Sequence, residues 1–433
     1  MSQKIKTGKV SRRSFLQASS GAVAIPFLAG AYAAGSDTIR VGVIGCGGRG
    51  TGAAMDALAA DPGLQIVALG DVLMDRVHEA RRRLSERYPE QTQVKDDHCF
   101  EGFDAYKSVI EASDVVLIAN AAKFHPMHQM AAIEAGKHVF VEKPHAIDPL
   151  GAKQVQAACD LAAKKNLCVV SGLQSRFHPG YQETMKRVHD GAIGDIIAIQ
   201  ETWLRPPYVL RERVPGMKEI LHQASNQYHF NWLSGDDVPQ TLIHNLDRSS
   251  WALHDAAPLS AYGMGGRSTL QGEIYGNVFD HHSVVYQFPE GVRVYAICRT
   301  IDNCYNENSS LILGSKGQCD LLRLRITGEN SWEQPGRSAD QNPYVLEHAA
   351  LFSAIRSGET IDSGYHMVRS TLIGMMGQLS CYTGQEITWE QLLASDYYFP
   401  PKPEECNEET EPPVKLGPDG SYPVLVPGKT ELI

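Results

Sequence analysis

The sequence lacks the paired cysteines, the metal-ligand spacings and the excess of positive charge that mark several large classes of protein. Its nine cysteines are odd in number and scattered, with no C-x-x-C, so neither a disulfide framework nor a zinc site is indicated. Most lie in apolar runs such as "NLCVVSG", where cysteine is a small buried side chain in a chain that folds in a reducing compartment. The net charge of -10 argues against nucleic acid or an anionic membrane as a partner.

The sixteen histidines form no metal-binding pattern either. His281 and His282 adjoin, and on a strand they would point to opposite faces. His125 and His128 share a helical face, but no nearby acid completes a ligand set. Both pairs are typical of histidines that cap a helix or lie in solvent. We expect no bound metal.

The apolar run near the N-terminus, "ASSGAVAIPFLAGAYAA", is short and broken by Pro26, too weak for a comfortable membrane span. It follows "SRRSFLQ" (residues 11–17), and Ala31 and Ala33 offer an A-x-A cleavage pattern. This is similar to a twin-arginine export signal over residues 1–35, which predicts a periplasmic or secreted protein without a membrane anchor. The alternative is a disordered basic tail. Twin-arginine export moves folded proteins, so a cofactor can be carried out inside the fold.

A glycine-rich loop follows the first predicted strand, "TIRVGVIG". Gly45, Gly47 and Gly50 fit G-x-G-x-x-G, with Gly48 and Arg49 in the intervening positions, and "TGAAMDALAAD" continues as a helix. Glycines here allow a tight turn, close approach to a pyrophosphate and close contact between helix and strand. The first amides of the helix would face the phosphates. The loop therefore predicts a dinucleotide site.

The second predicted strand, "LQIVALGD", ends in Asp71, 21 residues after Gly50. A carboxylate at this point accepts hydrogen bonds from an adenosine ribose and repels a 2'-phosphate, which favours NAD over NADP. Asp71 can also cap the helix that follows, and the two roles are compatible.

Strands and helices continue to alternate as far as "LCVVSGLQ", which predicts a doubly wound parallel sheet. Ligands of such sheets bind at the carboxyl ends of the strands, where Asn120, Lys143 and Gln174 are expected. Pro144 biases Lys143 toward extended geometry, so its side chain should project from the end of the strand. A lysine beside a nicotinamide can hydrogen-bond a substrate hydroxyl and favour its alkoxide. The alternative is a surface salt bridge between Glu142 and Lys143.

The run "AGKHVFVEKPHA" after a glycine-rich Rossmann half resembles the Gfo/Idh/MocA family of sugar and polyol oxidoreductases, from about residue 40 to about residue 390. The resemblance implies an α/β fold, with a Rossmann domain coupled to an α/β domain on a large open, mostly antiparallel sheet. It implies that Lys143 is catalytic. We expect a tightly bound NAD to contact a set of loop and strand-end residues: Gly45, Gly47, Gly48, Arg49, Gly50, Asp71, Arg76, Asn120, His125, Glu142, Lys143 and Gln174.

The second half of the chain predicts a different kind of domain. "DIIAIQETWL" and "LSAYGMGGR" predict strands, "HHSVVYQFPEGVRVYAICRTI" a hairpin and "SSLILGSKGQCDLLRLRITG" a further strand pair, before two helices return. We expect a NAD-binding domain over residues 36–155, a domain for substrate binding and oligomerisation over residues 156–395, and an extended proline-rich and acidic arm over residues 396–433. A homo-dimer or homo-tetramer is expected.

The segment "SGDDVPQTLIHNLDRSSWAL" takes the place of the family's acidic-x-x-x-His-x-x-Asp helix. The resemblance implies that His244 is the catalytic histidine, with Asp247 and Trp251 three and seven residues after it. Gln240 stands where the family commonly has an acid, and glutamine can orient a hydroxyl but cannot take its proton. His244, with a pKa near neutrality, is then the expected base. The alternative for His244 is a histidine that packs the helix.

Aromatic and polar residues alternate in "NQYHFNWLSGDD", just before that helix. Aromatic faces beside hydrogen-bonding groups suit a sugar ring, so Tyr228, His229 and Asp236 are expected substrate contacts, together with Gln240 and His244.

Three functions fit these observations. The first is an exported, NAD-dependent oxidoreductase of a sugar, polyol or glycoside hydroxyl. The second is a glycoside hydrolase that uses NAD transiently by oxidation, elimination and hydration, but such hydrolases carry a Tyr-Pro-Thr-His-Gly run where this chain has "VPQTLIHNLD". The third, a non-catalytic sugar-binding protein, is supported only by Gln240.

Overall fold

In a computed structural model of the chain, residues 38–335 and 342–433 are described, and they belong to one compact unit. The predicted export signal, residues 1–35, lies outside these residues. Within residues 38–335 and 342–433, no helix is long and apolar enough to cross a membrane.

The first half folds around a six-stranded sheet in which every pair of neighbouring strands is parallel, in the order β3-β2-β1-β4-β5-β6. Its strands are β1 (Ile39–Ile44), β2 (Leu64–Asp71), β3 (Cys99–Glu101), β4 (Val115–Ile118), β5 (His138–Val141) and β6 (Val169–Ser171). The doubly wound sheet expected from the alternation of strands and helices is confirmed. The short edge strand β3 was not expected, because three residues carry no readable alternation.

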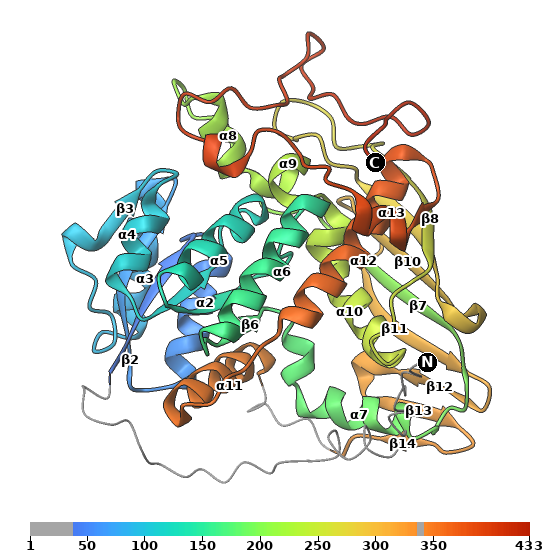
Figure 1. Cartoon of the computed structure of the whole chain (residues 1–433). Coiled ribbons are helices and arrows are strands. Elements are labelled where there is room, and N and C mark those ends of the chain that lie inside the picture. The colour runs from blue at the N-terminus through green and yellow to red at the C-terminus, as the bar shows by residue number, and fades with distance from the viewer. Residues whose placement is uncertain (1–37, 336–341) are drawn as a thin grey trace, which may run out of the picture. The chain divides into compact units, whose positions relative to one another are not determined.

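Helices cover both faces of this sheet (Figure 1). They are α2 (Gly48–Ala60), α3 (Met74–Arg87), α4 (Ala105–Ala112), α5 (His125–Glu134) and α6 (Pro149–Lys164), joined by α11 (Pro343–Ser357) from much later in the chain. Leu351, Phe352 and Ile355 of α11 belong to the same buried cluster as the β1 side chains. The expected boundary after residue 155 falls inside α6, and β6 lies beyond it.

The second half folds around a nine-stranded sheet in the order β14-β13-β12-β11-β7-β10-β9-β8-β15. Only the β7–β10 pair is parallel, so the expected mostly antiparallel sheet is confirmed. The strands are β7 (Ile196–Arg205), β8 (Ser260–Gly266), β9 (His281–Gln287), β10 (Arg293–Thr300), β11 (Glu307–Gly314), β12 (Gly317–Asp320), β13 (Arg325–Gly328), β14 (Trp332–Glu333) and β15 (Ile387–Thr388). The β9–β10 hairpin through residues 289–291 is as expected, whereas three strands, β11 to β13, replace the expected pair.

The other helices pack between and beside the two sheets: α7 (Pro179–His189), α8 (Glu219–Ser225), α9 (Asn231–Ser234), α10 (Ile243–Ala252), α12 (Gly364–Thr383) and α13 (Trp389–Ala394). The long helix α12 contacts α6 on one side and strands β8 and β9 on the other (Figure 1). Its buried residues share one apolar cluster with side chains of both sheets. The two halves therefore hold one continuous core between them.

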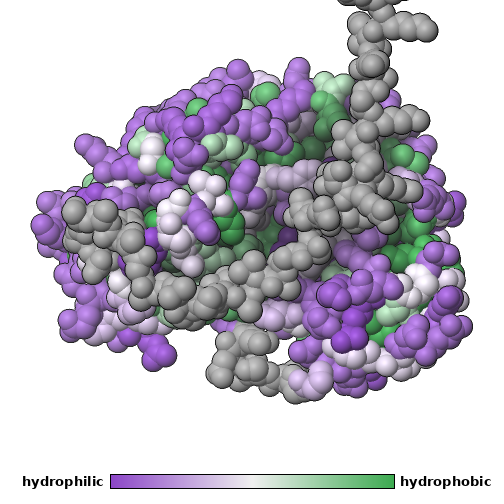
Figure 2. All heavy atoms as spheres, turned by 60° about the horizontal axis from the view of Figure 1, so that its bottom comes forward, coloured by the Kyte–Doolittle hydropathy of each residue, from purple (hydrophilic) through white to green (hydrophobic). Residues whose placement is uncertain are grey.

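Polar residues cover most of the face shown in Figure 2, and hydrophobic residues gather there in smaller areas. All nine cysteines are free thiols. His281 is exposed, as expected, but His125 and His128 are only 1% and 4% exposed and His282 is buried, so the interpretation of these three as solvated histidines is wrong. Among the described residues, no group of three or more histidines, cysteines or acids could hold a metal ion.

Candidate active site

A cleft of about 290 Å³ opens at the carboxyl edge of the first sheet. Its wall combines residues from the ends of β4 and β5 and from α2 with residues of the second half. The lining residues are Arg49, Ala119, Asn120, Ala122, Glu142, Lys143, Gln227, Tyr228 and Gln240. Six of them (Arg49, Asn120, Glu142, Lys143, Tyr228 and Gln240) are among the residues singled out from the sequence.

The glycine loop between β1 and α2 has the shape of a phosphate cradle. Gly45 has φ +94°, and a Cβ on Gly50 would lie 1.7 Å from the Gly45 carbonyl oxygen, so neither position accepts a side chain. A Cβ on Gly47 or Gly48 would meet nothing within 4 Å, which leaves open space above the loop. Gly47 is the N-cap of α2 and no side chain caps the helix, so its first N–H groups are available to an anion.

Arg49 crosses from this loop to other parts of the site. Its guanidinium lies 2.8 Å from an Asp56 oxygen and 3.1 Å from a Glu142 oxygen, and it stacks over the Tyr344 ring at 4.9 Å. The buried Oδ1 of Asn120 has no hydrogen-bond partner. An open cradle beside an unpaired buried acceptor fits a bound dinucleotide.

Asp71 ends β2 beside the glycine loop. Its carboxylate accepts hydrogen bonds from the backbone N–H of Cys46 at 2.8 Å and of Leu73 at 3.1 Å. The expected capping role is wrong, because Leu73 is the N-cap of α3 and the first N–H group of the helix, that of Met74, donates to the Glu101 carboxylate at 2.9 Å. Burial raises the pKa of Asp71, partly offset by the Arg76 guanidinium 4.0 Å away. Arg76 also donates to the Ser225 carbonyl oxygen at 2.7 Å and so joins α3 to α8.

Lys143 connects the end of β5 to the second half. Its Nζ donates to the backbone oxygen of Gln240 at 2.8 Å, and its side chain is half-buried. An ammonium group has three N–H donors, so it keeps donors for a ligand in the cleft. His125 lies behind this loop, with Nδ1 2.8 Å from the Pro144 oxygen and Nε2 3.0 Å from the Asn120 oxygen. Burial lowers the pKa of His125 to about 4, and it holds two strand ends together without lining the cleft.

Gln240 and His244 lie on consecutive turns where a π-helical turn, η5 (Val238–Leu242), leads into α10. Turns of this kind are frequent at functional sites. His244 is 6% exposed, its ring lies 5.9 Å from that of Trp203, and its buried Nδ1 has no partner. Burial holds the pKa of His244 well below 6.5, and the charge of Lys143 lowers it further. The expected pKa near neutrality is therefore wrong, and the imidazole is neutral.

Residues 39–173 match the Gfo/Idh/MocA profile, described as an oxidoreductase family with an NAD-binding Rossmann fold. Residues 39–173, which form the first sheet and helices α2 to α6, are therefore similar to the NAD-binding domain of that family. An inositol 2-dehydrogenase/D-chiro-inositol 3-dehydrogenase of Shouchella clausii is 28% identical over 220 residues, which are 50% of this chain and 54% of that protein. A family 109 glycosyl hydrolase of Bacteroides fragilis is 39% identical over 114 residues, 26% of this chain and 23% of that protein. The chain spans about half the length of the first curated relatives it matches.

Solved structures extend the similarity of fold to both halves. An aldose-aldose oxidoreductase from Caulobacter crescentus superposes with a TM-score of 0.62 at 19% identity, over 81% of this chain and 99% of that one. A levoglucosan dehydrogenase solved with NADH and levoglucosan has a TM-score of 0.62 at 16% identity, over 81% and 99% of the two chains. At such identities the likeness establishes the fold alone.

Outside the matched residues 39–173, the remaining predicted residues have varied surroundings. Gln174, in η3 (Gln174–Phe177) after β6, donates to the Tyr344 hydroxyl at 3.1 Å, and its buried Oε1 has no partner. The Asp236 carboxylate hydrogen-bonds groups of the protein: it accepts from the backbone N–H of Phe279 at 2.9 Å and from the Tyr382 hydroxyl at 2.6 Å.

Asp247 and Trp251 both contact the same arginine. Asp247 accepts from Arg176 Nε at 2.9 Å and from the Ser370 hydroxyl at 2.8 Å. The Trp251 ring lies 5.4 Å from the guanidinium of Arg176. These two members of the helix motif therefore fix α10 in place.

Three acidic or aromatic residues near the site were missed by reading the sequence. Tyr344 and Glu347 come from α11, and Glu347 is fully buried without a hydrogen-bond partner. Burial raises the pKa of Glu347 well above its ordinary value, and the Glu142 carboxylate adds to the rise. Glu201 on β7 accepts from Asn245 and Ser249 of α10, at 2.8 and 2.7 Å, and burial raises its pKa to about 7. A lone acid within an apolar run is the signal that could have identified Glu201 and Glu347.

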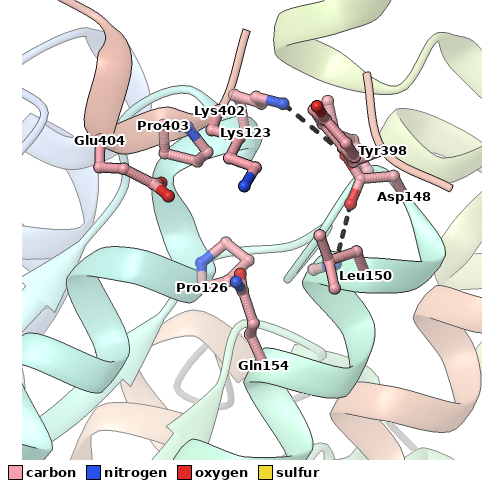
Figure 3. A pocket seen from close by; sticks show the side chains of 11 residues that line it. Lys123, Pro126, Asp148, Leu150, Gln154, Tyr398, Lys402, Pro403 and Glu404 are labelled. Carbon is pink, nitrogen blue, oxygen red and sulfur yellow. Dashed lines mark hydrogen bonds and ion pairs between the residues drawn. The ribbon is translucent and has the colours of Figure 1, made fainter. Parts of the chain in front are cut away.

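The C-terminal residues dock beside α5 and α6 around a separate hollow of about 450 Å³ (Figure 3). The Lys123 ammonium points into it, donates to the Phe399 carbonyl oxygen and lies 3.8 Å from an Asp148 oxygen. Asp148 accepts from the Phe399 backbone N–H at 3.1 Å. Burial lowers the pKa of Lys123. None of the predicted site residues lines this hollow, whose polar groups bind the chain's own arm.

The same arm then crosses a covering segment, residues 206–230, which supplies Gln227 and Tyr228 to the cleft (Figure 1). Tyr422 is fully buried; its hydroxyl donates to Glu219 and accepts from Arg213 at 2.9 Å. Lys218 pairs with Glu409 at 2.6 Å. The arm thus holds one side of the covering segment.

Proposed function

We propose that this chain is an exported, NAD-dependent oxidoreductase that acts on a hydroxyl group of a sugar, polyol or glycoside. One observation carries the proposal: at the carboxyl edge of the first sheet, the Lys143 ammonium contacts the helical turn that bears Gln240 and leads to His244. The named relatives, an inositol dehydrogenase among them, support the same class of substrate.

A nicotinamide dinucleotide bound along the glycine loop supplies the acceptor for the hydride of the hydroxyl-bearing carbon. Lys143 donates a hydrogen bond to the substrate oxygen and stabilises negative charge as it develops there. His244 is neutral and takes the hydroxyl proton on a free ring nitrogen. Gln240, which cannot take a proton, orients the hydroxyl. Trp203 and the buried helix α10 keep water from the imidazole.

The test is anaerobic titration of the purified protein with sugars and polyols while the reduced-nicotinamide absorbance is followed. An increase in that absorbance with a polyol or sugar supports the proposal. A protein that binds nucleotide but gives no such change with any sugar, polyol or glycoside contradicts it.

The alternative is an NAD-dependent glycoside hydrolase, favoured by the 39% identity to the family 109 hydrolase over 114 residues. That match covers only 26% of this chain, and the chain has "VPQTLIHNLD" in place of the hydrolases' Tyr-Pro-Thr-His-Gly run. A hydrolase of this kind releases an aglycone without net change in the nucleotide, so the same titration separates the two functions.

Replacing Asp71 with alanine should weaken NAD binding and reduce discrimination against NADP. The carboxylate would be lost both as an acceptor for the ribose and as a repulsive charge toward a 2'-phosphate. Dissociation constants for both nucleotides measure the effect, with Asp75→Ala on the exposed side of α3 as the control. If the unmodified protein binds NADP more tightly than NAD, the neighbouring Arg76 and not Asp71 decides the preference.

We also propose that the protein is exported with its nucleotide already bound. The twin-arginine pattern of residues 11–17 supports export, and the arm that holds the covering segment supports slow nucleotide release. Retention through export requires a dissociation constant of about nanomolar or below, roughly -12 kcal/mol. Donor and acceptor sugars would then react in ping-pong order.

Extensive dialysis should leave nucleotide bound and activity independent of added NAD. Tyr422→Phe, which removes the hydroxyl contact to Glu219 and Arg213, should speed nucleotide loss measurably, whereas Lys415→Ala on the exposed part of the arm should not. A protein that emerges nucleotide-free and recovers only with millimolar NAD would show that the cofactor exchanges freely.

A homo-dimer or homo-tetramer completes the proposal. Tyr262 of β8 and Tyr295 of β10 both pair in register with Val285 of β9, so the three side chains form a row across one face of the second sheet. Val284 and Tyr286 lie buried on the other face, and Met264 is exposed near the row. An exposed apolar row on a sheet face is typical of a protein interface.

A further inference from the structure

A second hollow, of about 240 Å³, lies next to the catalytic cleft and shares Tyr228 with it. We call it the distal hollow. It is formed where the ends of β7 and β10 meet the covering segment and the residues before η5. The lining residues that the argument uses are Arg205, Tyr208, Tyr228, His229 and Asp237.

One wall of the distal hollow is aromatic. The rings of Tyr208 and Tyr228 stack at 4.1 Å with an interplanar angle of 18°. The Arg205 guanidinium lies 3.7 Å from the centre of the Tyr208 ring, and the Tyr208 hydroxyl is 2.9 Å from that of Thr241. The stacked pair is therefore held in place before any ligand arrives. Flat, preorganised aromatic walls with a few polar groups suit the apolar face of a sugar ring.

Three polar atoms of residues that line the distal hollow are buried without a hydrogen-bond partner: Oδ2 of Asp237, Nε2 of His229 and Nε of Arg205. The other Asp237 oxygen accepts from Arg205 at 2.6 Å and from Thr241 at 2.6 Å. Buried polar groups are nearly always paired in folded proteins, so unpaired ones beside a hollow indicate a missing polar ligand.

The charges of the distal hollow favour an uncharged ligand. The Asp237 carboxylate is balanced by Arg205, and burial lowers the pKa of His229 to about 4, so its ring is neutral. A carboxylate acceptor and a neutral imidazole match the hydroxyl groups of a neutral sugar. The catalytic cleft, which holds Lys143 and Gln240, lies on the other side of the shared Tyr228.

We propose that the distal hollow is a subsite for a second, uncharged sugar unit, so that the preferred substrate is a disaccharide or longer glycoside. One ring presents its hydroxyl to Lys143, and the next stacks on the tyrosine wall and hydrogen-bonds Asp237 and His229. This assignment rests on the proposed function and adds the size and charge of its substrate.

The experiment compares kcat/KM for maltose, cellobiose and lactose with kcat/KM for glucose and galactose, in the full-length protein. At least one disaccharide should exceed its constituent monosaccharides by roughly 10-fold or more, as expected for hydrogen bonds to substrate hydroxyls. His229→Ala should lower that ratio by about 10-fold or more. Asp237→Asn, which keeps the side-chain volume, should also lower the ratio of kcat/KM for the disaccharide to that for its monosaccharides. The matched control is His78→Ala, an exposed histidine on α3 outside both hollows.

Calorimetric titration of the same sugars separates failure of the subsite from failure of the proposed function. If no sugar is oxidised but a disaccharide binds in a His229-dependent way, the subsite stands and the oxidoreductase proposal fails. If kcat/KM is higher for monosaccharides than for disaccharides, the subsite is rejected while the oxidoreductase proposal stands. The same holds if His229→Ala and Asp237→Asn lower kcat/KM equally for disaccharides and monosaccharides. Absence of both turnover and disaccharide binding rejects the subsite as well.

Discussion

Lys143→Ala is expected to lower turnover by ~10²–10⁴, the usual range for a positioned electrostatic or proton-transfer group. The ammonium lies at the end of β5, 2.8 Å from the Gln240 oxygen, where it can reach a ligand in the cleft. Alanine removes the charge that stabilises a developing alkoxide. Folding and nucleotide binding should remain nearly intact, because the glycine loop and Asp71 are untouched.

The measurement is kcat with the best substrate found, together with a nucleotide dissociation constant and a thermal melt. Lys164→Ala, on an exposed turn of α6, is the matched control and should change none of them. An alanine variant at position 143 with an unchanged kcat would remove this lysine from the mechanism. A loss of nucleotide binding instead of turnover would assign it to the cofactor.

His244→Ala is expected to cut turnover by a similar ~10²–10⁴, since it removes the imidazole that is proposed to take the hydroxyl proton. The pH dependence follows from burial. The pKa of His244 is held well below 6.5, so the base form persists as the pH falls from 8 through neutrality. The rate in the oxidising direction should therefore fall only in more acidic solution, where the imidazole becomes protonated and can no longer take a proton.

The pH–rate profile of the wild-type protein gives the first measurement, and a proton NMR titration of the His244 ring gives the second. Because the charge of Lys143 helps to lower the pKa of His244, the NMR midpoint in Lys143→Ala should shift upward. His78→Ala is again the control, and its profile should match that of the wild type. A midpoint near 6.5 in the wild-type protein would contradict a buried, neutral imidazole.

Much of the first half could be predicted because its signals are local. Strand β1, the glycine loop and helix α2 are consecutive in the chain, and the turn geometry depends on Gly45 and Gly50 themselves. Strand ends carry Asp71 and Lys143 to the same sheet edge, since parallel strands all point one way. Six of the nine residues that line the cleft could thus be named before their distances were known.

The misreadings came from properties that no local pattern contains. His125 and His128 were judged by their neighbours in the sequence, whereas the packing of the whole fold buries them. The pKa of His244 moved for the same reason, because the dielectric around an imidazole is set by everything that packs on it.

The sequence by itself determined the doubly wound sheet, the dinucleotide loop and the chemical character of the cleft, because periodicity and glycine positions act over a few residues. Only the tertiary structure decided which distant elements complete the site. Helix α11 returns to place Tyr344 against Arg49, β7 places Glu201 under α10, and the arm places Tyr422 against the covering segment. An apolar helix face or an extended arm does not specify its partner, since hydrophobic burial is non-directional and the choice depends on the packing of the whole chain.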